Sequence, residues 1–308
     1  MRTLRVGTRG SPLALAQTDA VIALVRAHAP KVECVSHRIT TRGDVMRDVP
    51  LAAIGGRGVF ADAIEDALLA GEIDFAVHSA KDLPSDTTSG LTIAAVPARE
   101  DARDVLVSNA GVLHALPSDA RVGTSSQRRA CQLLAIRPDL DIRDLRGNVD
   151  TRLRKLDDGD YDAIVLAGAG LRRLGLTSRV TEWLPIDAML PAPGQGALAI
   201  EARAGDTEVL DLLAPLNDPE AALALSAERA FLARLGTGCA AAVAAFGLVS
   251  SDRQITLQAM IGAPDGRLVR GERTAPTDDA ALGAALCDEL LDRGGRALVT
   301  ERARERAG

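Results

Sequence analysis

The sequence predicts an α/β fold of two similar doubly wound lobes around a cleft, followed by a small α+β C-terminal domain. Three observations predict it. Strand and helix patterns alternate from the N-terminus onward, Val-Gly-Thr at 6–8 recurs at 122–124, and the pattern of 71–77 recurs at 159–165. With 308 residues and 47% hydrophobic content, the chain is long enough to bury more than one core.

The first strand covers residues 4–8, and a capped helix follows it. Ser11 is a favoured N-cap residue and Pro12 suits the first helical position, so we expect a helix from Pro12 to about His28. The free amides at its start, with Arg9 and Ser11 beside them, predict an anion site.

A second strand is expected at 32–40, and a polar, glycine-rich loop at 41–58 that matches no phosphate-binding fingerprint. Apolar residues from Phe60 to Leu68 then share one helix face, and Gly71 ends that helix. A further strand is expected at 91–96.

The stretch from Ile73 to Pro84 is a strand that ends in charged residues. Apolar side chains alternate along it, and Pro84 forces a turn at Lys81-Asp82. Polar groups at the carboxyl end of a buried strand are where α/β sheets hold their chemistry. On this stretch alone, an equally well supported interpretation is that Lys81 and Asp82 are ordinary solvated turn residues.

The second lobe repeats this plan but places arginines where the first places an acid. A capped helix is expected at 127–136, and Asn148 can cap another. The repeated strand ends in Gly168-Ala169-Gly170 and has no carboxylate. Basic residues gather near the helix starts and after the last strand, which predicts a cleft for a polycarboxylate or phosphate: Arg128, Arg129, Arg146, Arg152 and Arg173.

The segment 190–196 is rich in proline and glycine, as expected where a chain crosses between domains. We expect a first lobe of residues 1–98 plus 197–214, a second of 102–190, and a C-terminal domain of 218–308. In the last, a helix from Asp218-Pro219 to Leu235 precedes Cys239, two strands flank the turn 263–266, and a helix covers 278–291. Cys239 lies among small residues; an exposed cysteine without an activating partner is more often inert than reactive.

Composition excludes several classes of function. The net charge of -6 and 2% aromatic content disfavour nucleic-acid binding. With no apolar signal core and no stretch of about 18 apolar residues, we expect a cytoplasmic protein without membrane partners. The dispersed cysteines and histidines predict neither a metal site nor disulfides. Only Lys31, Lys81 and Lys155 are lysine, so 36 − 3 = 33 basic residues are arginine, which codon bias explains in total. Only the placement of particular arginines is informative.

Six motifs together resemble the porphobilinogen deaminase (hydroxymethylbilane synthase) family. They span nearly the whole chain in order: Thr8–Leu15, Val77–Pro84, Gly123–Arg129, Arg146–Arg152, Leu190–Ala197 and Gly238-Cys239. The resemblance implies three domains, the first two like periplasmic-binding-protein lobes. It also implies a monomeric transferase of heme and porphyrin (tetrapyrrole) biosynthesis that joins four porphobilinogen molecules head to tail, with loss of ammonia, and releases hydroxymethylbilane.

The resemblance assigns roles to particular residues. Cys239 carries a dipyrromethane cofactor through a thioether, and Asp82 is the catalytic acid that stabilises a cationic azafulvene. The cofactor-binding residues are Lys81, Ser126, Arg128, Arg129 and Arg146, and the substrate-binding residues are Arg9, Ser11, Phe60, Arg152 and Arg173. Guanidinium groups suit this ligand because every pyrrole carries carboxylates.

Some positions depart from the family pattern, namely Gly10, Arg57, Asp150 and Ala240-Ala241-Ala242, and they concern the cofactor pocket rather than the reaction. The alternative function is a two-lobed anion-binding or ligand-sensing protein without catalysis. Such a protein needs neither Asp82 nor Cys239, and the absence of an export signal weighs against it.

Overall fold

The computed structural model describes residues 2–45, 61–236, 242–277 and 279–299. The chain forms two compact units, one of Met1–Glu100 with Gly196–Ala222 and the other of Asp101–Gln195 with Leu223–Gly308. We call the first unit the first lobe. Within the second unit, we call 101–195 the second lobe. We call 219–308 the C-terminal part, of which 219–222 belong to the first unit in this division. The predicted boundaries of three domains stay a prediction.

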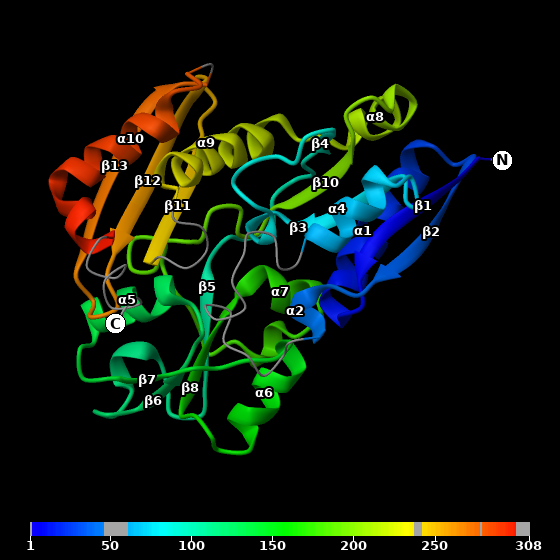
Figure 1. Cartoon of the computed structure of the whole chain (residues 1–308). Coiled ribbons are helices and arrows are strands. Elements are labelled where there is room, and N and C mark those ends of the chain that lie inside the picture. Colours follow the sequence, from blue (N-terminus) through cyan, green and yellow to red (C-terminus); the bar gives the residue numbers. More distant parts are fainter. Residues whose placement is uncertain (1, 46–60, 237–241, 278, 300–308) are drawn as a thin grey trace. The chain divides into compact units, whose positions relative to one another are not determined.

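The first lobe contains a five-stranded sheet of order β2-β1-β3-β10-β4 (Figure 1). Its strands are β1 (Arg2–Arg9), β2 (Val32–Ile39), β3 (Phe75–Ser79), β4 (Leu91–Ala95) and β10 (Leu198–Arg203). β1, β2 and β3 are parallel, and β10 is antiparallel to both its neighbours. Its helices are α1 (Pro12–His28), α2 (Arg42–Val45), α4 (Asp62–Leu69), α8 (Thr207–Leu213) and the short η4 (Ala214–Leu216).

Helix α1 begins and ends where the sequence predicts. The Ser11 hydroxyl accepts a hydrogen bond from the Ala14 amide at 3.2 Å. Buried residues of α1 and α8 share one core with β1 and β3, while α4 packs on the opposite face of the sheet. The prediction of a polar loop from Thr41 is wrong in detail, because one helical turn, α2, follows Thr41, and threonine is a favoured residue before a helix.

The second lobe repeats the first. Its sheet has the order β7-β6-β8-β5-β9, with β6, β7 and β8 parallel and β5 antiparallel between β8 and β9. The strands are β5 (Asp104–Ser108), β6 (Arg121–Gly123), β7 (Asp141–Arg143), β8 (Ala163–Ala167) and β9 (Glu182–Trp183). The helices are α5 (Gln127–Ile136), α6 (Val149–Asp157), α7 (Gly168–Arg173), and the short η2 (Leu113–Ala115) and η3 (Thr177–Arg179). Helices cover both faces of each sheet, so the predicted doubly wound fold is confirmed.

Both lobes also have an ion pair just before the strand that lies third in the sheet, β3 in the first lobe and β8 in the second. In the first lobe the Asp74 carboxylate accepts the Arg5 amide at 2.7 Å and pairs with its guanidinium at 2.8 Å. In the second, Asp162 accepts the Arg121 amide at 2.8 Å and pairs with its guanidinium at 2.8 Å. Each arginine begins the repeated Val-Gly-Thr segment, so the sequence repeat is a structural repeat.

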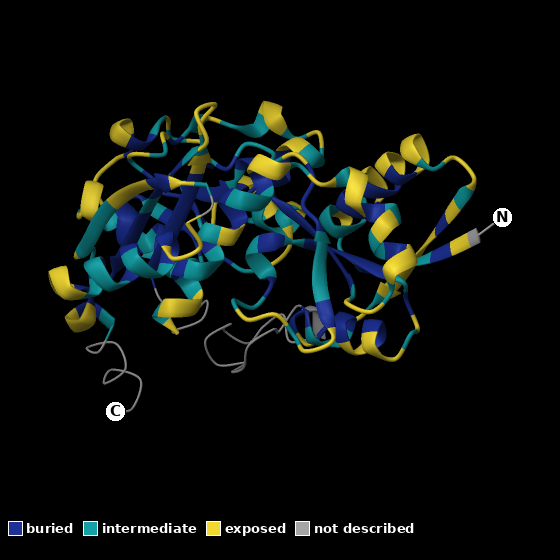
Figure 2. Cartoon of the chain, turned by 90° about the horizontal axis from the view of Figure 1, so that it is seen from above, coloured by how far each residue is buried: buried dark blue, intermediate teal, exposed yellow. Residues whose placement is uncertain are grey.

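The C-terminal part is an α+β unit, as predicted. It contains α9 (Pro219–Leu235), the antiparallel strands β11 (Ala242–Val249), β12 (Gln254–Gly262) and β13 (Leu268–Pro276), α10 (Leu282–Leu290) and a π-helical turn (Leu291–Gly295). One face of this sheet packs against α9 and α10, and the other packs against Cys131 of α5. Figure 2 shows the sheets mostly buried and the outer sides of the helices exposed.

Candidate active site

Asp82 lies at the carboxyl end of the central strand of the first lobe. β3 ends at Ser79, and the short 3-10 helix η1 (Ala80–Asp82) follows, so the predicted turn is present. The Ala80 amide donates to the Ala197 carbonyl at 3.1 Å, and the Leu83 amide closes the turn onto the Ala80 carbonyl at 3.3 Å. These bonds hold Asp82 at the sheet edge where α/β proteins bind ligands.

The Asp82 carboxylate lies near a cation and is partly exposed. Its Oδ2 atom is 3.9 Å from Nη1 of Arg9, the last residue of β1, and the Asp82 side chain is 35% exposed. At this distance the contact is an ion pair rather than a hydrogen bond. Of the predicted site residues, Arg9, Ser11, Lys81 and Asp82 all belong to the first lobe, and Arg9, Ser11 and Lys81 are half-buried.

The second lobe contains a buried cluster in which positively charged side chains outnumber negatively charged ones. The Asp104 carboxylate is fully buried; Arg128 contacts its Oδ2 atom at 2.7 Å and Arg129 contacts its Oδ1 atom at 2.7 Å. Gln195 donates to Oδ1 at 2.9 Å. Burial alone would raise the pKa of Asp104, but the two guanidinium groups outweigh it and lower that pKa to about 2.

The predicted residues Ser126, Arg128 and Arg129 therefore lie together at the start of α5, where the Ser126 hydroxyl accepts the Arg129 amide at 3.4 Å. Arg128 also donates to the Leu190 carbonyl at 2.6 Å. Sequence reasoning missed their common partner, Asp104. An acid at the head of an apolar strand is a signal that could have found it, because a buried carboxylate needs a cationic partner.

The cluster holds two guanidinium groups against one carboxylate, so it keeps an excess positive charge. Among the described residues, three buried arginine nitrogens have no hydrogen-bond partner: Arg128 Nε and Arg146 Nη1, which belong to predicted site residues, and Arg270 Nε, which does not. Unsatisfied buried donors and uncompensated positive charge suit a carboxylated ligand. The residues present therefore fit a dipyrromethane group with its acetate and propionate side chains.

The other predicted arginines also belong to the second lobe. Arg152 is half-buried on α6, and its Nε atom donates to the Gly147 carbonyl at 2.8 Å. Asn148 caps α6 by accepting the Thr151 amide at 3.0 Å. Arg173 is the last residue of α7 and is half-buried.

Several predictions lie outside the described residues, namely those for Phe60 and Cys239, and for the departures Arg57, Ala240 and Ala241. Two other departures can be assessed. A side chain at Gly10 would meet no atom of the described residues within 4 Å, so these residues leave room for either size. Asp150 lies in the first turn of α6, where an acid is favourable.

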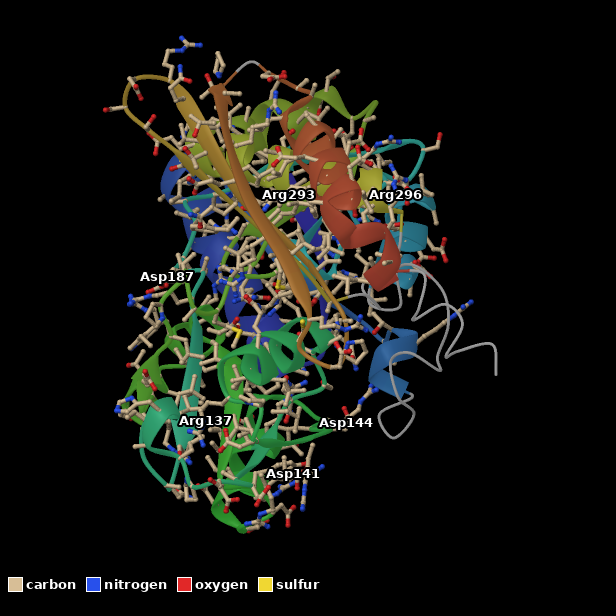
Figure 3. All side chains as sticks on the ribbon, turned by 90° about the vertical axis from the view of Figure 1, so that its left-hand side faces the viewer. Arg137, Asp141, Asp144, Asp187, Arg293 and Arg296 are labelled. Carbon is tan, nitrogen blue, oxygen red and sulfur yellow. The ribbon has the colours of Figure 1, made fainter. Side chains whose placement is uncertain are left out.

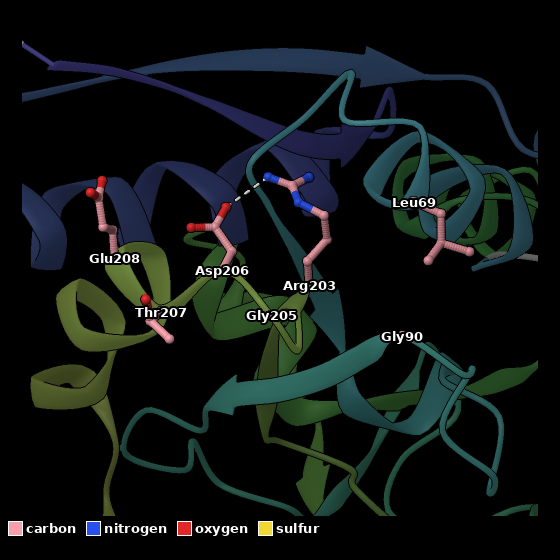
Figure 4. Close-up of a pocket in the computed structure, with 7 residues that line it drawn as sticks. All are labelled: Leu69, Gly90, Arg203, Gly205, Asp206, Thr207 and Glu208. Atoms are coloured by element: carbon pink, nitrogen blue, oxygen red, sulfur yellow. Dashed lines mark hydrogen bonds and ion pairs between the residues drawn. The ribbon is translucent and has the colours of Figure 1, made fainter.

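A pocket in the first lobe is not part of this site. It is lined by Leu69, Gly90, Arg203, Gly205, Asp206, Thr207 and Glu208 (Figure 4). Arg203 ends β10, which runs antiparallel to β3, so the pocket lies at the sheet edge opposite Asp82. The Arg203 guanidinium forms an ion pair with Asp206 at 2.8 Å and donates hydrogen bonds to the Leu68 and Ile73 carbonyls. It offers no ligand-binding group that the predicted chemistry requires.

Many arginines outside the site form ordinary surface pairs. Arg293 and Arg296, beside the C-terminal helix in Figure 3, pair with Glu289 and Asp292 at 3.1 and 3.0 Å. Exposed pairs of this kind contribute little to stability. The total number of arginines is therefore uninformative, as the composition suggests.

One lobe has an acid at a strand end and the other has a buried arginine cluster, a combination of charges that suits a carboxylated ligand. Residues 4–211 match the family model "Porphobilinogen deaminase, dipyromethane cofactor binding domain", and 222–292 match its C-terminal domain. The chain belongs to the porphobilinogen deaminase family. It is accordingly a transferase of tetrapyrrole synthesis with a dipyrromethane cofactor.

Similar proteins cover almost the whole chain. The porphobilinogen deaminase of Roseiflexus castenholzii is 57% identical over 96% of this chain and 98% of its own length. That of Brevibacillus brevis is 47% identical over 98% of each chain. Among solved structures, the methionine-binding protein MetQ has a TM-score of 0.41 at 15% identity, covering 74% of this chain and 96% of that chain. The substrate-binding protein of an amino acid ABC transporter has a TM-score of 0.37 at 15% identity, covering 70% and 91%.

The family relationship decides against the alternative of a binding or sensing protein without catalysis. Among the helices that the structure describes, none has the length and apolar character needed to cross a membrane.

Proposed function

We propose that the chain joins four porphobilinogen molecules head to tail, with Asp82 as its catalytic carboxylate and Cys239 as the attachment point of the cofactor. The observation that carries this proposal is the position of Asp82, at the end of β3 and 3.9 Å from Arg9. A partly exposed carboxylate there can meet a substrate while the sheet holds its backbone still.

The chemistry follows from that position. As the C–N bond of the substrate breaks and ammonia leaves, positive charge spreads over the pyrrole ring, and the Asp82 carboxylate stabilises it. A new C–C bond then forms, and the ring proton that it displaces passes to Asp82. The Arg9 guanidinium, 3.9 Å away, forms an ion pair with this carboxylate.

The cofactor belongs to the second lobe in this proposal. Ser126, Arg128, Arg129 and Arg146, together with Lys81, hold its carboxylates, and Arg9, Ser11, Phe60, Arg152 and Arg173 bind those of the substrate. When bound, the dipyrromethane supplies the pyrrole carbon to which the first substrate unit is joined. The excess positive charge around Asp104 supports this division.

We further propose that the enzyme acts in the cytoplasm as a monomer on a small-molecule substrate, without nucleic-acid or membrane partners. The net charge of -6 and the 2% aromatic content support the part of this proposal that excludes nucleic-acid partners. We also propose three domains: residues 1–98 with 197–214, residues 102–190, and residues 218–308, the last carrying Cys239.

Replacement of each cysteine tests the assignment. Purified wild-type protein should carry the mass of two linked pyrroles, and Cys239→Ser should fold, lack that mass and make no product. The matched controls are Cys34→Ser, Cys131→Ser and Cys287→Ser, whose thiols are buried. Burial raises the pKa of Cys131 and of Cys287 to about 11, so neither is a nucleophile at neutral pH.

The controls should keep the cofactor and lose only about 1 to 3 kcal/mol of packing energy. Intact-mass spectrometry and product formation measure both outcomes. Normal turnover by Cys239→Ser, or a cofactor found on another cysteine, would show the assignment to be wrong.

A further inference from the structure

The face of the first-lobe sheet that packs against α4 buries three ionisable side chains. His78 of β3 and Glu201 of β10 are 3.1 Å apart, from Nε2 to Oε2, with side chains only 4% and 3% exposed. Glu65 of α4 is also buried and accepts a hydrogen bond from the Thr88 hydroxyl at 2.5 Å. Burial raises the pKa of Glu65, and the nearby Glu201 raises it further.

The second lobe shows that this fold does not need polar residues at these positions. In the first lobe Ser79 pairs with Leu198 and Ala76 with Glu201; in the second, Ala167 pairs with Asp104 and Ile164 with Val107. We align the two sheets by these pairs and the two helices by the glycines that follow them. The alignment places three apolar residues of the second lobe at the positions of the three ionisable residues of the first.

Leu166 takes the place of His78, and Val107 takes the place of Glu201. Gly71 and Gly159, both with positive φ, follow the ends of α4 and α6. Counted back from these glycines by the same number of residues, Leu153 takes the place of Glu65. All three apolar residues are buried in one core. The same architecture is therefore stable with leucine and valine at the sites where the first lobe buries ionisable side chains.

The polar set is costly by comparison. Desolvating an ion pair usually offsets its attraction, so apolar residues of similar volume are often equally or more stabilising. Neither His78 Nε2 nor Glu201 Oε2 makes a hydrogen bond in the described part of the chain, although the two atoms lie 3.1 Å apart. Two buried polar atoms without hydrogen bonds add to this cost. No group of side chains in that part of the chain could hold a metal ion, which leaves the pair without a metal role.

The pair adjoins the segment that carries Asp82. β3 continues from His78 into η1, and β10 accepts the Ala80 amide through the Ala197 carbonyl just before its first residue. Beyond Asp82, the Thr88 hydroxyl returns to Glu65. The chain from His78 to Thr88 is therefore anchored at both ends to the same buried polar set.

We propose that the His78–Glu201 pair positions Asp82, by fixing the lateral placement of the end of β3 against β10 more tightly than apolar contacts would. This inference rests on the proposed catalytic role of Asp82. It explains why the lobe with the acid buries a polar pair at this register and the lobe without the acid buries leucine and valine.

The test transplants the apolar pair of the second lobe into the first as the double variant His78→Leu/Glu201→Val. We expect unfolding temperature and cofactor mass to be kept and KM to stay within about twofold, while kcat falls about tenfold to a hundredfold, as a misplacement of about 1 Å can cause. A matched control, Val107→Leu/Leu166→Val, exchanges volumes in the second lobe and should leave kcat unchanged.

A fully loaded, stable double variant with wild-type kcat would overturn the inference. If the double variant does not fold, Glu201→Gln replaces it: it keeps an oxygen toward His78 but loses the charge, and a kcat lowered at least about fivefold supports the inference, whereas an unchanged kcat overturns it. Asp82→Asn, measured in parallel, separates the two proposals. Wild-type turnover by Asp82→Asn removes the role of Asp82 itself, whereas slow Asp82→Asn with a fast double variant removes only the positioning role.

Discussion

The two lobes share their strand order, their capped helices and the ion pair at the base of the third strand, but they differ at the other end of that strand. After β3 the chain forms η1 with Lys81 and Asp82, whereas after β8 it continues into α7 with Gly168 and Gly170. The comparison teaches that one scaffold can present an acid in one copy and hold cations in the other.

A tryptophan explains why the residue directly after β8 is glycine. A side chain on Gly168 would collide with the Trp183 ring, so this residue, which the strand pairing aligns with Ala80, must stay small. Trp183 itself lies between the guanidinium groups of Arg103 and Arg172, 4.9 and 4.7 Å from its ring centroid. In the second lobe the turn after the strand therefore packs against this stack.

The strongest test of the comparison is removal of the one carboxylate that the second lobe lacks. Asp82→Asn keeps the size and one acceptor but loses the charge, so turnover should fall at least about a hundredfold while the substrate still binds. Asp82→Glu keeps the charge on a longer arm, so it should keep some activity and hold partly elongated chains, which the mass of enzyme-bound intermediates reveals.

The control is Asp86→Asn, which removes an exposed carboxylate of the same segment and should leave turnover near that of the wild type. If Asp82→Asn turns over like the wild type, Asp82 is a turn residue and the two strand ends do not differ in catalysis.

The second test concerns the buried cluster. The pKa of Asp104 is lowered from 3.8 to about 2, so its ionised form stabilises the folded state by about 2 kcal/mol above pH 4, and this contribution is lost as the pH falls from about 4 to about 2. Asp104→Asn should therefore lower the free energy of unfolding by about 2 kcal/mol at pH 7, and its difference from the wild type should shrink below pH 4.

Thermal unfolding at a series of pH values measures this difference. Asp141→Asn, in an exposed pair with Arg143, is the control and should change stability by no more than about 0.5 kcal/mol. A difference that does not change between pH 4 and pH 2 would contradict the role of the Asp104 charge.

The smallest effect is expected from a second-lobe arginine with a buried, unpartnered nitrogen. Arg146→Leu should reduce cofactor loading about tenfold, which corresponds to one charge-assisted hydrogen bond of about 1.5 kcal/mol, and should leave stability intact. Arg128→Leu should reduce both loading and stability, because it removes a partner of buried Asp104. The control is Arg154→Leu, at an exposed position on α6. Equal loading in Arg146→Leu and Arg154→Leu would show that Arg146 does not bind the cofactor.

Local chemistry made most elements predictable. Ser11 and Pro12 start α1 at the predicted residue, and Gly71 and Gly159 follow the ends of α4 and α6 with the positive φ that glycine tolerates. Asn148 likewise caps the helix that it was expected to cap. Such signals depend on neighbours within one turn of chain, so a single sequence contains them.

The buried acid Asp104 left a signal in the sequence, but the partners within the polar clusters could not be paired, because they lie far apart in the chain and meet only in the folded structure. Asp104 contacts Gln195 across 195 − 104 = 91 residues, and His78 contacts Glu201 across 201 − 78 = 123 residues. Sequence reasoning identified the motif that contains His78 but had no means of finding Glu201. Sequence reasoning also returned 197–214 to the first lobe. It could not place β10 between β3 and β4, because only the strand pairing of the folded sheet shows that position.

The place of β10 constrains how the chain can fold during synthesis. β3 and β4 have both left the ribosome about a hundred residues before β10, yet β10 separates them in the finished sheet. A nascent chain that stops before Leu198 must therefore either leave a gap at the centre of its first sheet or pair β3 with β4 directly, which later has to be undone. Completion of the first lobe waits for the second to be translated, so this enzyme is expected to depend on slow, long-range closure rather than on domain-by-domain folding.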